Sequence, residues 1–347
     1  MKVAIITDQH FGARKNSKLF HDYFLKFYDN VFFPTLEERG IKTIIDMGDT
    51  FDNRRGIDFS ALEWAKDNYY DRLDRMGCSI HTIVGNHTAY YKNTNKLNAV
   101  DLLLREYKRI TVYSEPTEAR IGNLNILFIP WINDENSERS FKLIKTSSCK
   151  VAMGHLELSG FPPYRGFLME EGLDGKLFEG YTHVFSGHYH TRSDNGKIYY
   201  LGNPYEIYFN DVDDVRGFHI FDTETKELES INNPYKIHEV IKYSDDNHQL
   251  LDASKYENKI VKIIVKSKKS QRQFEKYLDK LYSVNVAELK IVENFAEDQQ
   301  VDTEYDFESE DTVSILRKYV EETEEHISKK KVNSIIQEIY KECSQII

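Results

Sequence analysis

Five short segments of this 347-residue chain end in side chains that commonly bind metal ions. They read TDQH, GDTFD, GNHT, GHLE and GHYH, and they offer carboxylates, imidazoles and an amide but no thiolate. This set suits manganese, iron or zinc better than calcium. Two such cations would hold a phosphate group and make water a nucleophile at neutral pH. The candidate residues are Asp8, His10, Asp49, Asp52, Asn86, His87, His155, His188 and His190.

Most of these segments directly follow a run of β-branched or apolar residues. In an open α/β sheet, residues just past the carboxyl ends of the strands converge on one crevice. Asp8 and His10 are two positions apart, as are His188 and His190, so in extended chain each pair faces one way. A single motif of this kind is usually a buried histidine with satisfied hydrogen bonds. The ordered set instead predicts one polynuclear metal site, in which the carboxylate of Asp49 can bridge two cations.

The segments between the motifs alternate between helical and strand patterns. Apolar residues recur at helical spacing in 17–39 and 58–76, and Pro34 is expected to kink or end the first of these helices. From about residue 110, short strands and hairpins predominate, and every motif stays at a strand exit. The pattern predicts a mixed sheet system with helices outside it, ending near residue 232.

Three further segments follow this first domain. Residues 233–295 read as strand, helix and strand, and they hold the main basic stretch of the chain. Residues 296–311 are acidic and poor in apolar residues, which is typical of a flexible linker. Residues 312–347 carry two short helical stripes, which we expect to dock on a partner rather than fold back. The basic stretch includes Lys266, Lys268, Lys269 and Arg272, for which a solvated surface is the alternative interpretation.

Bulk properties limit the function classes. The net charge is −11, whereas a protein that holds DNA by its own charge is usually basic. Either the partner is not nucleic acid, or metals, a local basic patch and another subunit supply the attraction. Cys78, Cys149 and Cys343 lack any paired spacing, which favours a reducing cytoplasm. The sequence has no run of about 20 apolar residues, so no membrane span is expected.

The ordered motifs resemble those of the calcineurin-like metallophosphoesterases over roughly residues 1–230. TDQHFG, GDTFD, HTIVGNH, GHLELSG and SGHYHT follow the order of SbcD-type nuclease subunits of recombination and repair complexes, which include bacteriophage members. The resemblance implies an α/β (α+β) fold, a four-layer metallophosphoesterase β-sandwich flanked by helices. It also implies a small α/β capping domain over 233–295 and C-terminal helices over 312–347.

The same resemblance implies a DNA exonuclease and endonuclease that uses two divalent cations. Manganese is the expected metal and magnesium the alternative. The implied partner is an SMC-like ABC ATPase with a coiled coil, bound through residues 312–347. A homodimer through helices within 58–110 is also implied. The expected location is the cytoplasm, that of the infected host cell for the phage members.

The resemblance also assigns a role to each candidate residue. One metal would be held by Asp8, His10, Asp49 and His190, and the other by Asp49, Asn86, His155 and His188. His87 would stand over the phosphate and stabilise or protonate the leaving oxygen. Asp52 would support the ligands from behind, and Arg54 and Arg55 would touch the DNA backbone or lie in a solvated loop. Thr88 departs from the pattern, because the family usually has an aspartate there to orient the histidine.

Two other classes of function are compatible with parts of this pattern. A phosphodiesterase or nucleotidase for small substrates would need the metal ligands, but neither the basic unit nor the C-terminal helices. A non-enzymatic scaffold on the same fold would not need the full ligand set, and only Thr88 favours it. Cleavage of linear DNA by the purified protein with manganese separates the nuclease from both.

Overall fold

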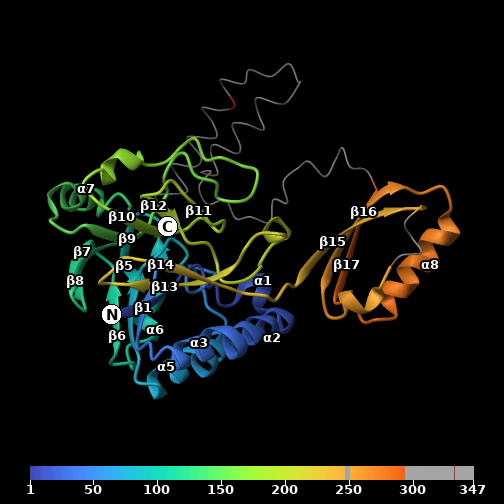
Figure 1. The fold of residues 1–347 in the computed structure, drawn as a ribbon, viewed down its shortest axis with the longest axis horizontal. Helices are drawn as coiled ribbons and strands as arrows, with labels where there is room; N and C mark the ends of the chain where they lie inside the picture. Colours follow the sequence, from blue (N-terminus) through green and yellow to red (C-terminus); the bar gives the residue numbers. More distant parts are fainter. Residues whose placement is uncertain (247–250, 294–331, 333–347) are drawn as a thin grey trace. The chain divides into compact units, whose positions relative to one another are not determined.

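The protein is described by a computed structural model in which residues 1–246, 251–293 and 332 are placed (Figure 1). The chain divides into two compact units, Met1–Phe295 and Ala296–Ile347. The predicted acidic linker, 296–311, and the predicted helical segment, 312–347, therefore lie outside the described residues except for Val332. Among the described residues, no helix has the length and apolar character that crossing a bilayer requires.

The first of two six-stranded sheets contains the amino-terminal strand. Its strands are β1 (Lys2–Ile6), β2 (Thr43–Asp46), β3 (Ser79–Ile83), β6 (Ile110–Tyr113), β13 (Gly217–Asp222) and β14 (Leu228–Asn232). Their order is β14-β13-β1-β2-β3-β6. Strands β1, β2, β3 and β6 are parallel, while β13 and β14 are antiparallel additions. The carboxyl ends of β1, β2 and β3 therefore meet at one edge.

The second sheet repeats this plan. Its strands are β7 (Thr117–Ile121), β8 (Leu124–Ile129), β9 (Val151–His155), β10 (His183–Gly187), β11 (Ser193–Asp194) and β12 (Ile198–Tyr200). Their order is β11-β12-β10-β9-β8-β7, with β12, β10, β9 and β8 parallel. The edge strands β11 and β7 pair antiparallel to their neighbours. Again, adjacent parallel strands end at the same edge.

One hydrophobic core lies between the two sheets, and a larger one lies between the first sheet and its helices. Alternate residues of β1 face opposite layers: Val3 and Ile5 lie between the sheets, while Ala4 and Ile6 pack against helices. This alternation follows from the two-residue period of a strand. Each fully buried isoleucine contributes about 1.5–3 kcal/mol relative to exposure. Helices, first sheet and second sheet therefore lie in successive layers, in agreement with the sandwich that the resemblance implied.

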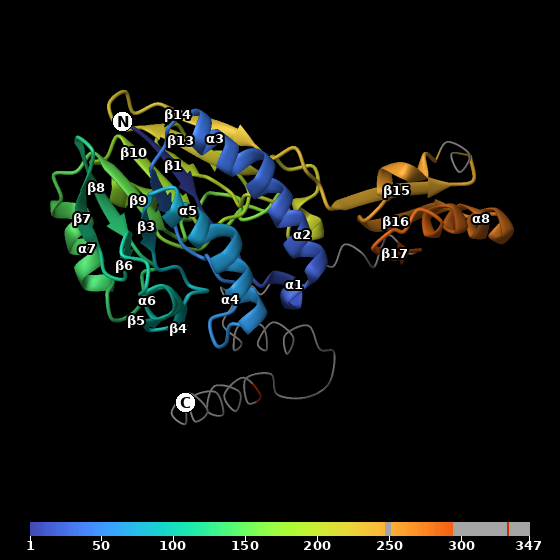
Figure 2. The same cartoon turned by 90° about the horizontal axis from the view of Figure 1, so that it is seen from below.

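Helices from two long segments cover the outer face of the first sheet (Figure 2). Phe24 and Phe27 on one segment and Tyr69 on the other are buried in this layer. Asp58 begins the second segment, since its carboxylate accepts the Ser60 N–H at 2.8 Å. The elements are α1 (Ala13–Asn16), α2 (Lys18–Phe27), η1 (Tyr28–Phe32), α3 (Phe33–Glu38), α4 (Phe59–Ala65), η2 (Lys66–Tyr70) and α5 (Asp71–Arg75).

Pro34 does not end the first helix, so that alternative of the prediction was wrong. Helical backbone continues from α2 into α3, and a π-helical turn, η1, ends two residues before the proline. Pro34 stands in the first turn of α3, where its missing N–H and fixed φ are tolerated. The wider π turn thus accommodates the proline without ending the helix.

A short hairpin and several small helices complete the two-sheet body. Their bounds are β4 (Ala89–Tyr91), β5 (Thr94–Asn98), α6 (Ala99–Leu103), α7 (Ser137–Thr146), η3 (Gly175–Phe178) and η4 (Phe209–Asp211). Strands β4 and β5 pair antiparallel directly after the third motif. Cys78 and Cys149 are buried free thiols.

The segment after β14 forms a third sheet with its own core. It consists of β15 (His238–Ser244), η6 (Ala253–Tyr256), β16 (Ile260–Ser267), α8 (Gln271–Tyr282) and β17 (Glu288–Val292). The three strands are parallel in the order β15-β16-β17. Tyr243, Phe274 and Leu281 are buried between the sheet and α8. The expected boundary near residue 232 coincides with the end of β14, although Met1–Phe295 clusters as one compact unit.

Candidate metal centre

All five motifs lie at the carboxyl ends of parallel strands. The first-sheet strands β1, β2 and β3 are followed by the motifs of Asp8, Asp49 and Asn86. His155 is the last residue of β9, and the GHYH motif begins at the end of β10. The two sheets therefore deliver their motifs to a common place, as the strand-exit argument predicted.

The side chains at this place form contiguous groups of metal-ligand atoms. In each group the atoms lie within 4.8 Å of one another. The groups are Asp8 with His10 and His190, Asp49 with His155 and His188, and His10 with Asp52 and His87. Nε2 of His10 and Nε2 of His190 are 3.2 Å apart, and Oδ1 of Asn86 is 2.9 Å from His155 Nε2. All the predicted ligands are thus brought together.

The backbone at several of these residues is held in a costly conformation. Asp8, His10, Asp49 and His188 have φ values of 52°, 47°, 51° and 81°. Residues other than glycine rarely adopt this left-handed region, which costs on the order of 1–3 kcal/mol each. Such strain persists only where the surrounding structure fixes it, and here it turns four side chains towards one point.

Two glycines leave room for these side chains. A Cβ built on Gly85 would overlap the Asp49 carboxylate, and one on Gly187 would overlap the Thr7 hydroxyl and crowd Asp8. Neither glycine has a positive φ, so close approach rather than backbone freedom requires it. The glycines that begin the third and fifth motifs, Gly85 and Gly187, are therefore part of the centre.

The electrostatics of the centre favour cations. Burial lowers the pKa of His188 to about 3 and that of His190 well below its usual value, so both imidazoles are neutral and able to bind a metal. Burial also opposes the charge on His155, but the carboxylates of Asp49 and Asp8 raise its pKa to about 9. Burial opposes the charge on Asp49 as well, but the surrounding histidines, first among them His155, together hold the pKa of Asp49 far below normal. A bound cation would take the place of the His155 proton, so these residues fit divalent metals.

Comparisons with known proteins agree with this geometry. The model of the calcineurin-like phosphoesterase family matches residues 1–192, more than half of the chain. This chain is a calcineurin-like phosphoesterase. It is also 34% identical over 285 residues to exonuclease subunit 1 of Enterobacteria phage T4, covering 82% of each chain.

Two solved structures are similar to this phosphoesterase. One is an archaeal phosphodiesterase, with 14% identity and a TM-score of 0.35, covering 67% of this chain and all of that one. The other is a dimetal phosphatase from Danio rerio, with 10% identity and a TM-score of 0.39, covering 68% of this chain and 97% of that one. Family membership implies divalent metals in the centre, without specifying which metal.

His87 stands at the edge of this phosphoesterase centre and is partly exposed. Its Nδ1 lies 2.6 Å from the main-chain oxygen of Asp52. Because a carbonyl only accepts, Nδ1 donates, which leaves Nε2 to exchange a proton with a substrate. The main-chain N–H of His87 donates to Asp49 at 2.8 Å. His87 is therefore positioned by two neighbouring loops.

Thr88 does not contact the ring of His87 in any described hydrogen bond. Its hydroxyl accepts the Gly85 N–H at 3.0 Å and donates to the Gly85 carbonyl at 3.1 Å, which closes the turn that holds Asn86 and His87. The Asp52 side chain lies 3.1 Å from Nδ1 of His10. The loop of Asp52 thus supports one predicted ligand and orients the predicted catalytic histidine.

A buried polar network behind the first two motifs was not predicted. Asp46 accepts hydrogen bonds from Gln9 at 2.9 Å and from the Thr50 hydroxyl at 2.8 Å, and burial raises its pKa to about 7. Tyr28 donates to the Gln9 side chain, and Tyr205 donates to the Gln9 carbonyl, both at 2.6 Å. Gln9 lies between Asp8 and His10, so the network fixes the turn that carries both ligands.

Arg216 was also missed. It is 3% exposed, and its guanidinium donates to the His190 carbonyl and to the side chain of Asn203. It also pairs with Asp211 at 3.0 Å and with Asp214 at 3.1 Å. A single Arg–Asp cluster therefore holds the main chain of the fifth motif from behind. No local pattern marks it, because Arg216 is 26 residues from His190.

The predicted DNA-contact residues lie in two places. Arg54 is partly buried and Arg55 is exposed on the loop after Asp52. At the junction of β16 and α8, Lys266, Lys269 and Arg272 are exposed, while Lys268 pairs with Glu293 at 2.6 Å. The exposed residues of this junction can meet a phosphate backbone. Their contact with DNA stays a prediction.

Proposed function

We propose that this phosphoesterase is a two-metal DNA nuclease that hydrolyses phosphodiester bonds at DNA ends. The single observation that supports it most is the pair of ligand groups, Asp8 with His10 and His190 and Asp49 with His155 and His188. His87 lies beside the first of them, in a group with His10 and Asp52. The similarity to a protein named exonuclease subunit 1 supports DNA as the substrate.

The roles proposed for the residues follow the two sheets. Asp8, His10 and His190 would hold one cation, Asn86, His155 and His188 would hold the other, and Asp49 would serve both. When bound, the cations supply positive charge to the phosphate oxygens and make water nucleophilic at neutral pH. His87, with Nδ1 fixed by the Asp52 carbonyl, presents Nε2 to the leaving oxygen. Manganese is the proposed metal, because the set mixes imidazole and carboxylate.

The basic junction of the third sheet would help to hold DNA as a capping domain. Segment 312–347 would bind an SMC-like ABC ATPase through its helical stripes, and the complex would act in the cytoplasm in recombination and repair. DNA binding shared between this chain and the ATPase is consistent with the net charge of −11. Deleting 312–347 should abolish capture of the ATPase but leave basal cleavage by the nuclease intact.

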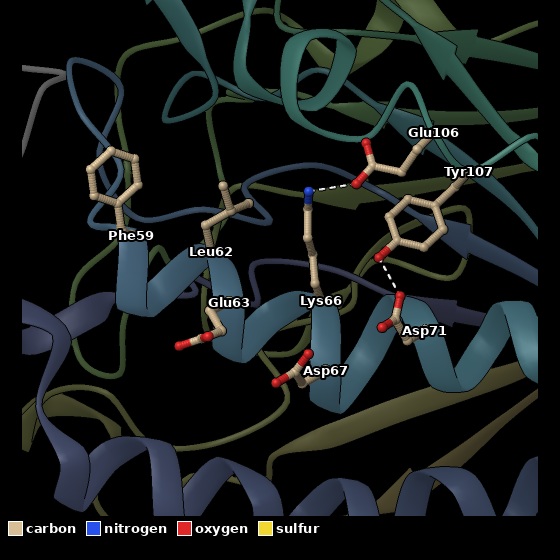
Figure 3. A pocket seen from close by; sticks show the side chains of 8 residues that line it. All are labelled: Phe59, Leu62, Glu63, Lys66, Asp67, Asp71, Glu106 and Tyr107. Carbon is tan, nitrogen blue, oxygen red and sulfur yellow. Dashed lines mark hydrogen bonds and ion pairs between the residues drawn. The ribbon is translucent and has the colours of Figure 1, made fainter.

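A homodimer through α4 and its neighbours is the remaining part of the proposal. Figure 3 shows Phe59 and Leu62 along α4, beside a shallow depression of about 410 Å³. Phe59 is 89% exposed, which is unusual for so large an apolar side chain. The rim is fixed by Lys66–Glu106 and Tyr107–Asp71 contacts at 2.5 Å. Changing Phe59→Glu should shift the molar mass measured by light scattering from dimer to monomer.

The nuclease assignment is tested with the purified full-length chain and end-labelled linear DNA. With manganese it should shorten the DNA, and chelation should stop it. Cleavage of only mononucleotides or small phosphodiesters would overturn the assignment in favour of a small-substrate phosphodiesterase. His87→Ser should abolish DNA cleavage while bound metal is retained. Undiminished cleavage by that variant would show that the proposed role of His87 is wrong.

A further inference from the structure

The hairpin of β4 and β5 exposes two adjacent tyrosines beside the metal centre. It begins two residues after His87. Tyr90 and Tyr91 are 40% and 43% exposed, and their rings meet edge to face at a centroid distance of 4.8 Å. Pairing in the hairpin shifts register between Ala89 and Tyr91, which is the irregularity that lets both neighbours reach solvent. Two large aromatic side chains are therefore exposed to solvent close in the chain to His87, the proposed catalytic residue.

The base of this hairpin is fixed by buried asparagines. Asn95 is 2% exposed, and its amide donates to the main-chain oxygens of Trp131 and Ser114 at 2.8 and 3.3 Å. The side-chain amide of Asn133 in turn donates to the side-chain oxygen of Asn95 at 3.0 Å. Satisfied buried amides hold a backbone in one arrangement. The tyrosines are therefore displayed by a rigid support and not by a loose loop.

The same support is tied to the metal centre. The Trp131 ring lies 5.1 Å from the ring of His188, a proposed ligand. The Thr88 carbonyl accepts the Ala99 N–H at 2.9 Å, which joins the end of the hairpin to the turn of the third motif. Figure 2 shows β4 and β5 beside α6, at one end of the two-sheet body. A substrate held on the tyrosines would thus keep a constant position relative to His87.

We propose that Tyr90 and Tyr91 form a stacking platform for unpaired bases of the DNA strand that enters the metal centre. This inference rests on the proposed nuclease function and specifies the form of its substrate. Exposed aromatic faces stack on any base, which suits an enzyme that must cut without regard to sequence. Lys92, exposed at the tip of the hairpin, adds a positive charge for the backbone. A protein partner is the other occupant that such a surface could take.

The test is equilibrium binding of a fluorescent single-stranded oligonucleotide to the full chain, measured by anisotropy with a chelator present so that nothing is cut. Tyr90→Ala and Tyr91→Ala should each weaken binding about tenfold, since stacking of one base is worth about 1–3 kcal/mol. Phenylalanine at either position should restore binding, because the ring and not the hydroxyl is used. Tyr282→Ala, at an exposed tyrosine on α8, is the matched control and should bind as the parent does.

Unchanged binding in both alanine variants, with unfolding temperature and metal content like those of the parent, would overturn the platform. Loss of ATPase capture in those variants without loss of oligonucleotide binding would assign the surface to a protein partner and also overturn it. If the phenylalanine variants bound the oligonucleotide as weakly as the alanine variants do, stacking would be excluded. Failure of the parent protein to cut any DNA is a separate result, which overturns the nuclease proposal itself.

Discussion

The first sheet supplies both carboxylates proposed as metal ligands, Asp8 and Asp49, whereas the second sheet supplies only imidazoles. Its residues are His155, His188 and His190. Residues of the second sheet are also oriented by groups of the first. Nδ1 of His155 lies 2.9 Å from the Met47 carbonyl, and the main-chain N–H of His188 donates to the Asp8 carboxylate at 3.1 Å.

This difference indicates that the first sheet is the template of the centre. It carries the negative charge, it raises the pKa of His155, and its main chain orients that ring. The second sheet contributes imidazole nitrogens to both proposed ligand groups. Substitution of the shared carboxylate of the first sheet should therefore weaken binding of both metals, whereas substitution of one second-sheet histidine should weaken binding of one.

The largest expected effect is that of Asp49→Asn. The amide keeps the shape but removes the charge that both cations would share, so we expect loss of both metals and a fall in DNA cleavage of about 10³-fold or more. His190→Asn is the matched change in the second sheet and should remove one metal. Stoichiometry by calorimetry and elemental analysis decides between them. Equal loss of metal in the two variants would break the proposed asymmetry.

The next effect concerns the glycines that begin the third and fifth motifs. Gly85→Ala and Gly187→Ala lie on different sheets, yet each would displace a carboxylate of the first sheet. We expect metal affinity to fall about 10–100-fold in both, the usual range when support of a ligand is disturbed. Gly56→Ala, where nothing lies within 4 Å of the added carbon, should bind metal normally. An unchanged affinity in Gly85→Ala would show that Asp49 has room to move.

Removal of the Arg216 charge should reduce stability more than affinity. In Arg216→Met, the buried carboxylate of Asp211 loses its guanidinium partner, and breaking a buried ion pair typically costs about 3–5 kcal/mol. Arg139→Met removes an exposed arginine paired with Glu115 at 3.5 Å and should cost less than about 1 kcal/mol. Denaturant unfolding with and without manganese measures both. If unfolding free energy fell only in the presence of manganese, Arg216 would act through metal binding at His190 and not through the stability of the fold.

The sequence alone predicted the parts of this molecule that have local signals. A run of β-branched residues followed by glycine and a ligand marks a strand exit, and parallel strands bring such exits together without further information. The meeting of Asp8, Asp49, Asn86, His155 and His188 follows from that rule. The arrangement in two packed sheets was implied by the family resemblance. The helix of residues 18–38 was also recognised, although the π turn before Pro34 was not.

The supporting residues could not be predicted, because their partners are distant in the chain. Tyr205 and Gln9 are 196 residues apart, and no period or motif connects them. Asp46 reads as an ordinary residue of a buried strand until Gln9 and Thr50 are seen to donate to it. The role of Thr88 was likewise inferred only from what it replaces, whereas its contacts show that it closes a turn.

Tyr205→Phe should have the smallest effect and is the finest test of the template. The change removes one hydroxyl that donates to the Gln9 carbonyl and leaves the ring in place, which should cost about 1 kcal/mol in unfolding free energy. Tyr199→Phe removes an exposed hydroxyl that donates to the Gly196 carbonyl at 3.0 Å and should cost close to nothing. If the turn of Asp8 and His10 is fixed from behind by this network, metal affinity in Tyr205→Phe should fall a few-fold as well. Affinity equal to that of the parent, despite the lost stability, would show that the strained turn is held by its own loop and that the network serves only the fold.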